Sequence, residues 1–218
     1  MREIGLAEHE WYKEALKFET FTELRQMFPG LEIRVGLEID FRRGRQDLGS
    51  LVACPWDYLI GSVHEIDGWS YDEPGEEDGF AAWDIDELYR RYFQLVAEVA
   101  ASGYFQIVGH LDLIKLYGHR SRRPVVELAE GALRAIARAG MAVEINAAGL
   151  FRPVKELYPA PELLSRCFAL NIPVTFGSDA HEPDQVGRGR AEALELLRRV
   201  GYTRLVGFKQ QEMYTRNL

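Results

Sequence analysis

Short apolar runs alternate with helix-like segments along almost the whole chain of 218 residues. The apolar runs are rich in β-branched and aromatic residues, which is typical of strands. They lie at residues 2–8, 31–40, 57–63, 104–109, 142–146, 173–177 and 203–208. Helical spacing of apolar residues is found at 11–28, 84–103, 124–139, 161–170 and 191–200. This alternation predicts the α/β class, with a mostly parallel sheet covered by helices.

No linker, low-complexity tract or internal repeat divides the chain, so we expect a single domain of residues 1–218. One segment, 65–83, is acidic, rich in Gly and aromatic residues, and too interrupted for a regular element. Long loops of this kind inside compact domains often cover active sites. A plain surface insertion is an equally good interpretation of the same residues.

Four of the five histidines directly follow a predicted strand. These are His9, His64, His110 and His181, and two carboxylates, Glu38 and Asp179, also lie at strand ends. The carboxyl ends of the strands in a (β/α) barrel meet at one mouth, where the chemistry of such barrels is located. Separate core, surface or helix-capping roles are the alternative for each residue. A shared site explains the repeated position better.

The six side chains offer nitrogen and oxygen donors without sulfur. This donor set suits zinc, manganese or iron better than calcium or a structural zinc site. Six ligands exceed what one tetrahedral zinc requires, and a carboxylate such as Glu38 can bridge two ions. The sequence therefore predicts at least two divalent ions.

The sequence lacks the motifs of several other classes of enzyme. The chain has no G-x-S-x-G elbow, no P-loop and no G-x-G-x-x-G turn. The run Gly187–Arg190 is either a small anion site or, more simply, the turn into the next helix. Arg152 and Lys155, in the loop after Asn146, are the candidates for binding a substrate anion. Ordinary solvated loop charge explains these two residues equally well.

The amino-acid composition limits the partners that the protein can bind and indicates its cellular compartment. The net charge of −8 argues against general binding of nucleic acid or of anionic membranes. No apolar stretch is long enough to span a bilayer, and we expect no membrane partner. Cys54 and Cys167 are too few for a disulfide framework, which favours a reducing compartment, so we expect a cytoplasmic protein. The sequence leaves assembly into a homo-oligomer open.

The motifs IGLAEH, VGLEIDF, LIGSVHEIDGW, IVGHLDLIKLYG, VEINAAGLFRPVKELYPAP and FGSDAH occur in this order. The chain thereby resembles the polymerase and histidinol phosphatase (PHP) superfamily, and among its members most resembles the histidinol-phosphatases. The resemblance runs from the first residues to about Gly189. It implies a distorted seven-stranded (β/α) barrel of the TIM type, with two or three zinc, manganese or iron ions at the carboxyl ends of the strands.

The resemblance also implies an activity and the roles of individual residues. Members hydrolyse a phosphate monoester, here L-histidinol phosphate to L-histidinol and phosphate in histidine biosynthesis. Carried over by motif, the metal ligands are His9, Glu38, His64, His110, Asp179 and His181. Glu38 would bridge the ions, Glu38, Asp179 and His181 would act in catalysis, and Arg152 lies where it could contact phosphate. Asp112 or His119 could protonate the leaving alcohol, or could be structural.

One departure from the family pattern concerns the N-terminus. The family opens with a strand bearing an H-x-H pair, and this chain contains no H-x-H. We therefore expect that the first barrel strand is missing from the given sequence, with an unpaired sheet edge and low activity as consequences. The alternatives are a catalytically impaired remnant that serves as a binding module, or a phosphatase acting on another phosphate ester.

Overall fold

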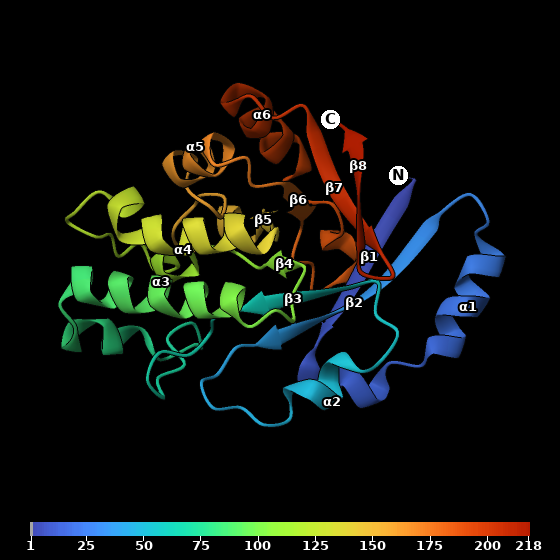
Figure 1. The fold of residues 1–218 in the computed structure, drawn as a ribbon, viewed down its shortest axis with the longest axis horizontal. Helices are drawn as coiled ribbons and strands as arrows, with labels where there is room; N and C mark the ends of the chain where they lie inside the picture. The colour runs from blue at the N-terminus through green and yellow to red at the C-terminus, as the bar shows by residue number, and fades with distance from the viewer. Residues whose placement is uncertain (1) are drawn as a thin grey trace.

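Six parallel strands form the body of the protein in a computed structural model that describes residues 2–218. The strands are β1 (Glu3–His9), β2 (Glu32–Asp40), β3 (Tyr58–Ser62), β4 (Ile107–Val108), β5 (Ala142–Asn146) and β6 (Val174–Gly177). Each strand pairs in parallel with the next one along the chain, so sheet order equals sequence order. The sheet curls into an open half-barrel (Figure 1), which confirms the predicted barrel-like α/β fold.

Six α-helices connect and cover the strands. They are α1 (Phe18–Met27), α2 (Leu48–Val52), α3 (Ile85–Ala101), α4 (Val125–Ala139), α5 (Pro161–Ala169) and α6 (Arg190–Val200) among the described residues. The side chain of Asp84 accepts hydrogen bonds from the backbone N–H groups of Asp86 and Glu87, at 3.0 and 3.1 Å, and so caps α3 at its predicted start. Gly140 ends α4 with φ of +68°, a conformation that favours glycine.

Two predicted elements differ in detail from the structure, and one observed helix has no predicted counterpart. The predicted helix 11–28 is a 3₁₀ helix (Glu10–Ala15) followed by α1, because Leu16 and Lys17 between them are extended. The predicted strand 104–109 is paired only over β4, and the short helix α2 was not predicted.

The last predicted strand, 203–208, is not part of the parallel sheet. It forms β7 (Arg204–Lys209) and pairs antiparallel with β8 (Glu212–Asn217), an element that the sequence analysis missed. The β7–β8 hairpin lies beside β1 (Figure 1), where Arg216 contacts Glu3 at 2.6 Å.

The hairpin covers the amino-terminal end of the sheet. Val206 and Phe208 share a buried cluster with Tyr58 and Ile60 from β3. The backbone N–H of Gln210 donates to Asp57 Oδ1 at 3.0 Å, just before β3 begins. The opposite, carboxyl-terminal end of the sheet carries the loops that contain the histidines.

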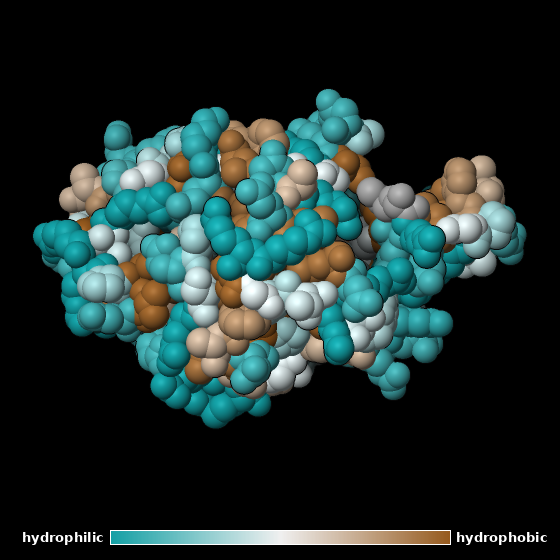
Figure 2. All heavy atoms as spheres, turned by 90° about the horizontal axis from the view of Figure 1, so that it is seen from above, coloured by the Kyte–Doolittle hydropathy of each residue, from teal (hydrophilic) through white to brown (hydrophobic). Residues whose placement is uncertain are grey.

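The face of the protein in Figure 2 is mostly hydrophilic, and the two cysteines form no disulfide. Hydrophilic residues cover most of the face shown in Figure 2, and apolar residues form separate patches on it. Within residues 2–218, no helix combines the length and apolar character needed to cross a bilayer. Cys54 and Cys167 are both free thiols.

Candidate metal centre

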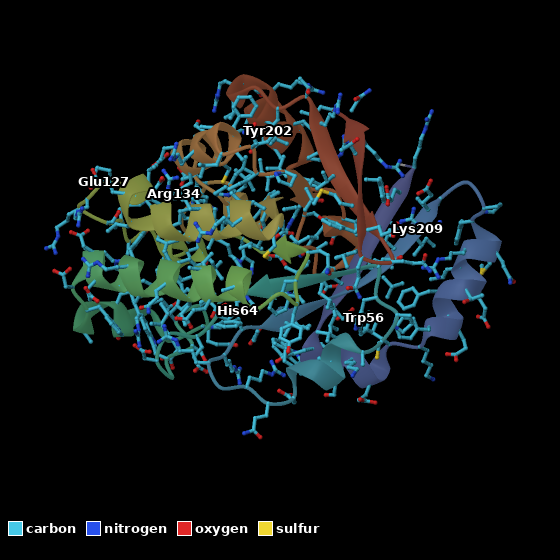
Figure 3. The ribbon with its side chains drawn as sticks, viewed as in Figure 1. Trp56, His64, Glu127, Arg134, Tyr202 and Lys209 are labelled. Carbon is cyan, nitrogen blue, oxygen red and sulfur yellow. The ribbon has the colours of Figure 1, made fainter. Side chains whose placement is uncertain are left out.

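Three side chains converge at the carboxyl ends of β2, β3 and β4. His110 Nε2 lies 3.1 Å from Glu38 Oε1 and 3.1 Å from His64 Nε2. His64 Nε2 lies 3.7 Å from Glu38 Oε1. One ligand atom from each residue falls within 4.8 Å of the other two. His64 lies just beyond the end of β3 (Figure 3).

Strand periodicity explains why Glu38 points into this site. The neighbours Leu37 and Ile39 are fully buried in the apolar core, so Glu38 lies on the opposite, inner face of β2. Ser62, the last residue of β3, donates a hydrogen bond from its hydroxyl to Glu38 Oε1 at 2.6 Å. The carboxylate is therefore fixed by the adjacent strand.

The ring of His64 is oriented by Asp40. Asp40 Oδ1 lies 2.7 Å from His64 Nδ1, which leaves Nε2 facing Glu38 and His110. A carboxylate behind an imidazole fixes both its tautomer and its orientation in metal sites. Asp40 was not among the predicted site residues, although its position two residues after Glu38 on the same face of β2 was a usable signal.

A second buried network supports His110 and Asp179. Glu144 Oε2 accepts hydrogen bonds from the backbone N–H of His110 at 3.1 Å and from Asn146 Nδ2 at 2.9 Å. Asn146 Nδ2 also lies 3.3 Å from Asp179 Oδ2. Burial, together with the charge of Asp179, raises the pKa of Glu144 to about 7. Glu144 was also missed, although it is paired with Asn146 at a two-residue spacing on β5.

The other three predicted ligands lie beside this group in a more open arrangement. The His9 ring centroid is 6.0 Å from that of His64 and 5.8 Å from that of His181. His9 also stacks on Trp11 at 4.3 Å. Asp179 Oδ1 lies 3.6 Å from Nδ1 of His181, an exposed residue. All six residues thus form one continuous cluster.

The electrostatics of the cluster fit a bound cation. Burial opposes the charged form of Glu38, but the hydrogen bond from His110 and the nearby imidazoles hold the pKa of Glu38 well below its usual range. Burial likewise disfavours the charged form of His64, yet Asp40 and Glu38 raise its pKa to about 10. The Nε2 atoms of His64 and His110 face each other at 3.1 Å, so only one of the two can carry a hydrogen there. In addition, His9 Nδ1 is buried with no hydrogen-bond partner within residues 2–218. Two imidazole nitrogens and one carboxylate are a donor set that suits a divalent transition metal.

The two candidate proton donors have structural surroundings. Asp112 is buried, lies 2.9 Å from Lys115 Nζ and accepts a hydrogen bond from the backbone N–H of Ala160 at 3.0 Å. His119 stacks on Phe80 with ring centroids 4.4 Å apart. These contacts favour the structural interpretation of both residues over transfer of a proton to substrate.

The basic residues near the site differ in their contacts. Arg152 and Lys155 are exposed in the loop after β5, and no side-chain contact joins either to the six-residue cluster within residues 2–218. Arg188 is tied down instead: its Nη2 donates to the backbone oxygen of Asp179 at 3.3 Å, and its guanidinium lies 4.7 Å from the ring of Phe151. Gly189 is the N-cap of α6, so the run Gly187–Arg190 leads into that helix, as the simpler prediction had it.

Comparison with known proteins places the chain in a family. The model of the PHP domain matches residues 1–148, and that of the PHP-associated region matches 167–196. A probable histidinol-phosphatase of Deinococcus radiodurans is 42% identical over 193 residues, which cover 87% of this chain and 73% of that protein. The histidinol-phosphatase of Bacillus subtilis is 30% identical, over 76% of this chain and 69% of that protein.

A solved structure shares the fold. The histidinol phosphate phosphatase of Lactococcus lactis, crystallised with zinc, L-histidinol and phosphate, superposes with a TM-score of 0.76 at 21% identity, covering 98% of this chain and 88% of that one. The sequence motifs, the matching domain model and the close relatives agree, and the chain belongs to the PHP domain family.

Proposed function

We propose that this chain is a metal-dependent phosphomonoesterase that hydrolyses L-histidinol phosphate to L-histidinol and phosphate, a step of histidine biosynthesis. The observation that carries the proposal is the convergence of Glu38, His64 and His110 at the carboxyl ends of three parallel strands. The names of the relatives, at up to 42% identity over most of the chain, support the choice of substrate.

We further propose that the centre holds two or three divalent ions, either zinc, manganese or iron. Glu38, His64 and His110 would hold one ion, and His9, Asp179 and His181 beside them would complete the centre. The ions, when bound, polarise the phosphoryl oxygens and make water a competent nucleophile near neutral pH. Glu38, Asp179 and His181 are the residues to which we assign direct participation in catalysis.

The surrounding residues keep the ligands in position. Ser62 holds the Glu38 carboxylate, Asp40 holds His64, and Glu144 fixes the backbone at His110. Ligands held in this way need little rearrangement when substrate binds, which is a large part of what an active site contributes.

We propose Arg152 and Lys155 as the residues that bind the phosphate from the solvent side. Both lie in the loop that follows β5, so they are on the same end of the sheet as Asn146. The same loop returns to β5 at Tyr158, whose backbone N–H donates to the backbone oxygen of Asn146 at 3.0 Å and whose ring centroid is 6.5 Å from that of His110. An arginine there could bind phosphate in a bidentate manner.

The chain as a whole is proposed to act as one domain, residues 1–218, in the cytoplasm. The parallel sheet runs without interruption from β1 to β6. Val206 and Phe208 of β7 pack with residues of β3, and Gln210 in the hairpin turn donates to Asp57. The two free cysteines are consistent with a reducing compartment.

The test is phosphate release from L-histidinol phosphate by protein that has been stripped of metal and then supplied with manganese or zinc. We expect activity only with metal, and a loss of about 10-fold or more in His64→Ala and His110→Ala. His119→Ala is the matched control, because it removes a histidine outside the cluster, and it should keep its activity.

Three results would count against this proposal. Equal release with and without metal would contradict the metal centre. Release from other phosphate esters but not from L-histidinol phosphate would refute the substrate and leave the reaction class standing. No release from any ester would favour a binding module.

A further inference from the structure

The loop between β3 and α3 brings one carboxylate, Asp72, to the edge of the candidate metal centre. Asp72 Oδ2 lies 4.0 Å from His64 Nε2, the nitrogen that also faces Glu38 and His110. Asp72 does not belong to the group of ligand atoms within 4.8 Å of one another among the described residues. Its side chain is 21% exposed, so a ligand can reach the carboxylate.

The backbone at Asp72 is anchored on both sides. Tyr71 is fully buried, and its hydroxyl donates to the backbone oxygen of Val63 at 2.6 Å. The hydroxyl of Tyr117 lies within hydrogen-bonding distance of the backbone oxygens of Asp72 and Glu73, at 3.3 and 3.1 Å. The loop therefore holds this carboxylate at a defined place beside the centre.

Within residues 2–218, no lysine, arginine or hydrogen-bond donor is paired with the Asp72 carboxylate. Two other acids of the same loop have such partners: Asp67 pairs with Arg91 at 2.7 Å, and Glu65 lies 3.7 Å from Arg42. His64, at 4.0 Å, is the nearest basic group to Asp72 among the described residues, but it is shared with two closer carboxylates, Asp40 at 2.7 Å and Glu38 at 3.7 Å. A largely buried carboxylate that is so incompletely paired costs folding free energy, and a cationic ligand would offset that cost.

We propose that Asp72 binds a protonated amine on the alcohol portion of the substrate, and so selects phosphate monoesters of amino alcohols. The inference rests on the proposed function for the position of the phosphate, at the ions beside His64. An ammonium group is a compact cation with three donors, and its hydrogen bonds to a carboxylate are charge-assisted. With phosphate bound at the centre and ammonium at Asp72, the two ends of the substrate are held by groups of opposite charge, which fixes its orientation.

The test compares two non-hydrolysable ligands that differ in one amine, 2-aminoethylphosphonate and ethylphosphonate. Their affinities for manganese-loaded protein are measured by calorimetry, with metal content checked by elemental analysis. We expect the wild type to prefer the amine-bearing ligand by about 10-fold or more, the range for hydrogen bonds to a charged group. Asp72→Asn should remove this preference and leave the metal content unchanged.

Glu76→Gln is the matched control, because Glu76 is an exposed acid of the same loop, and it should keep the preference. The inference is overturned if the wild type shows no preference, if Asp72→Asn retains it, or if Asp72→Asn loses metal, which would make Asp72 a metal ligand instead.

Turnover separates this inference from the proposed function. If the wild type hydrolyses no phosphate ester but its amine preference depends on Asp72, the proposed function fails and the inference stands. If L-histidinol phosphate is hydrolysed and Asp72→Asn leaves its KM unchanged, the inference fails and the proposed function stands.

Discussion

Replacing Lys115 by Met should destabilise the protein strongly, because its ammonium group is buried among three acceptors. Lys115 Nζ lies 2.9 Å from Asp112 Oδ2, 2.7 Å from Glu156 Oε2 and 2.8 Å from the backbone oxygen of Leu157. Lys115 and Asp112 are each 1% exposed. The contacts of Lys115 with Glu156 and Leu157 therefore join the loop after β4, which carries His110, to the loop after β5.

The expected magnitude follows from what the substitution leaves behind. Asp112 would keep only the hydrogen bond from the Ala160 N–H, and its Oδ1 already has no partner among the described residues. Breaking a buried pair from one side costs about 3–5 kcal/mol of unfolding free energy. At about 2–4 °C per kcal/mol for a chain of this size, the melting temperature should fall by about 6–20 °C.

The assay is equilibrium unfolding in urea, with Arg123→Met as the control. Arg123 and Glu127 form a pair at 2.9 Å in which both side chains are 54% exposed, and losing such a pair costs at most about 1 kcal/mol. The double variant Lys115→Met/Asp112→Asn should be more stable than Lys115→Met alone, because no unpaired charge is left.

The pH dependence of stability gives a second check on the effect of Lys115→Met. Burial raises the pKa of Asp112, although Lys115 opposes this, and without Lys115 the pKa should rise further. A carboxyl group with a raised folded-state pKa destabilises the native protein above its unfolded pKa of about 3.9. The deficit of Lys115→Met should therefore shrink as pH falls from 8 towards 4. A deficit below about 1 kcal/mol at pH 8, or a double variant no more stable than the single one, would refute this reasoning.

Three further predictions concern the candidate centre. Ser62→Ala removes the hydrogen bond to Glu38 and should weaken metal binding about 10- to 100-fold in a chelator competition, whereas Ser102→Ala, outside the centre, should not. Because the pKa of His64 is raised to about 10, the unfolding free energy of the metal-free protein should fall as pH rises from about 6.5 to about 10; a flat profile in urea titrations with a chelator would contradict this. Metal at 100 times its Kd should stabilise the native state by about 2.7 kcal/mol in thermal unfolding, an effect that His110→Ala should reduce.

Much of the fold followed from local sequence patterns. The alternation of strands and helices, the cap at Asp84 and the stop at Gly140 depend on near neighbours in the chain, and the structure confirms them. The β7–β8 hairpin escaped prediction because its placement depends on distant partners, such as Asp57 and Glu3, rather than on its own periodicity.

The residues of the candidate site also fall into two groups: those that local sequence patterns reveal and those that depend on distant contacts. The histidines could be found because they recur directly after strands, and topology then brings those positions together. Asp40 and Glu144 each stand two residues from another polar site residue on the same strand, but only the paired strands reveal that they lie behind His64 and His110. Asp72 lies in an irregular loop, so its approach to His64 depends on how that loop packs.

Anomalous X-ray diffraction from crystals of the protein grown with zinc tests the central claim most directly. We predict a strong zinc peak bound by His64 Nε2, His110 Nε2 and the Glu38 carboxylate, with at least one more peak beside His9, Asp179 and His181. Zinc found only at other surface sites, with Glu38, His64 and His110 still in direct contact with one another, would contradict the proposed metal centre.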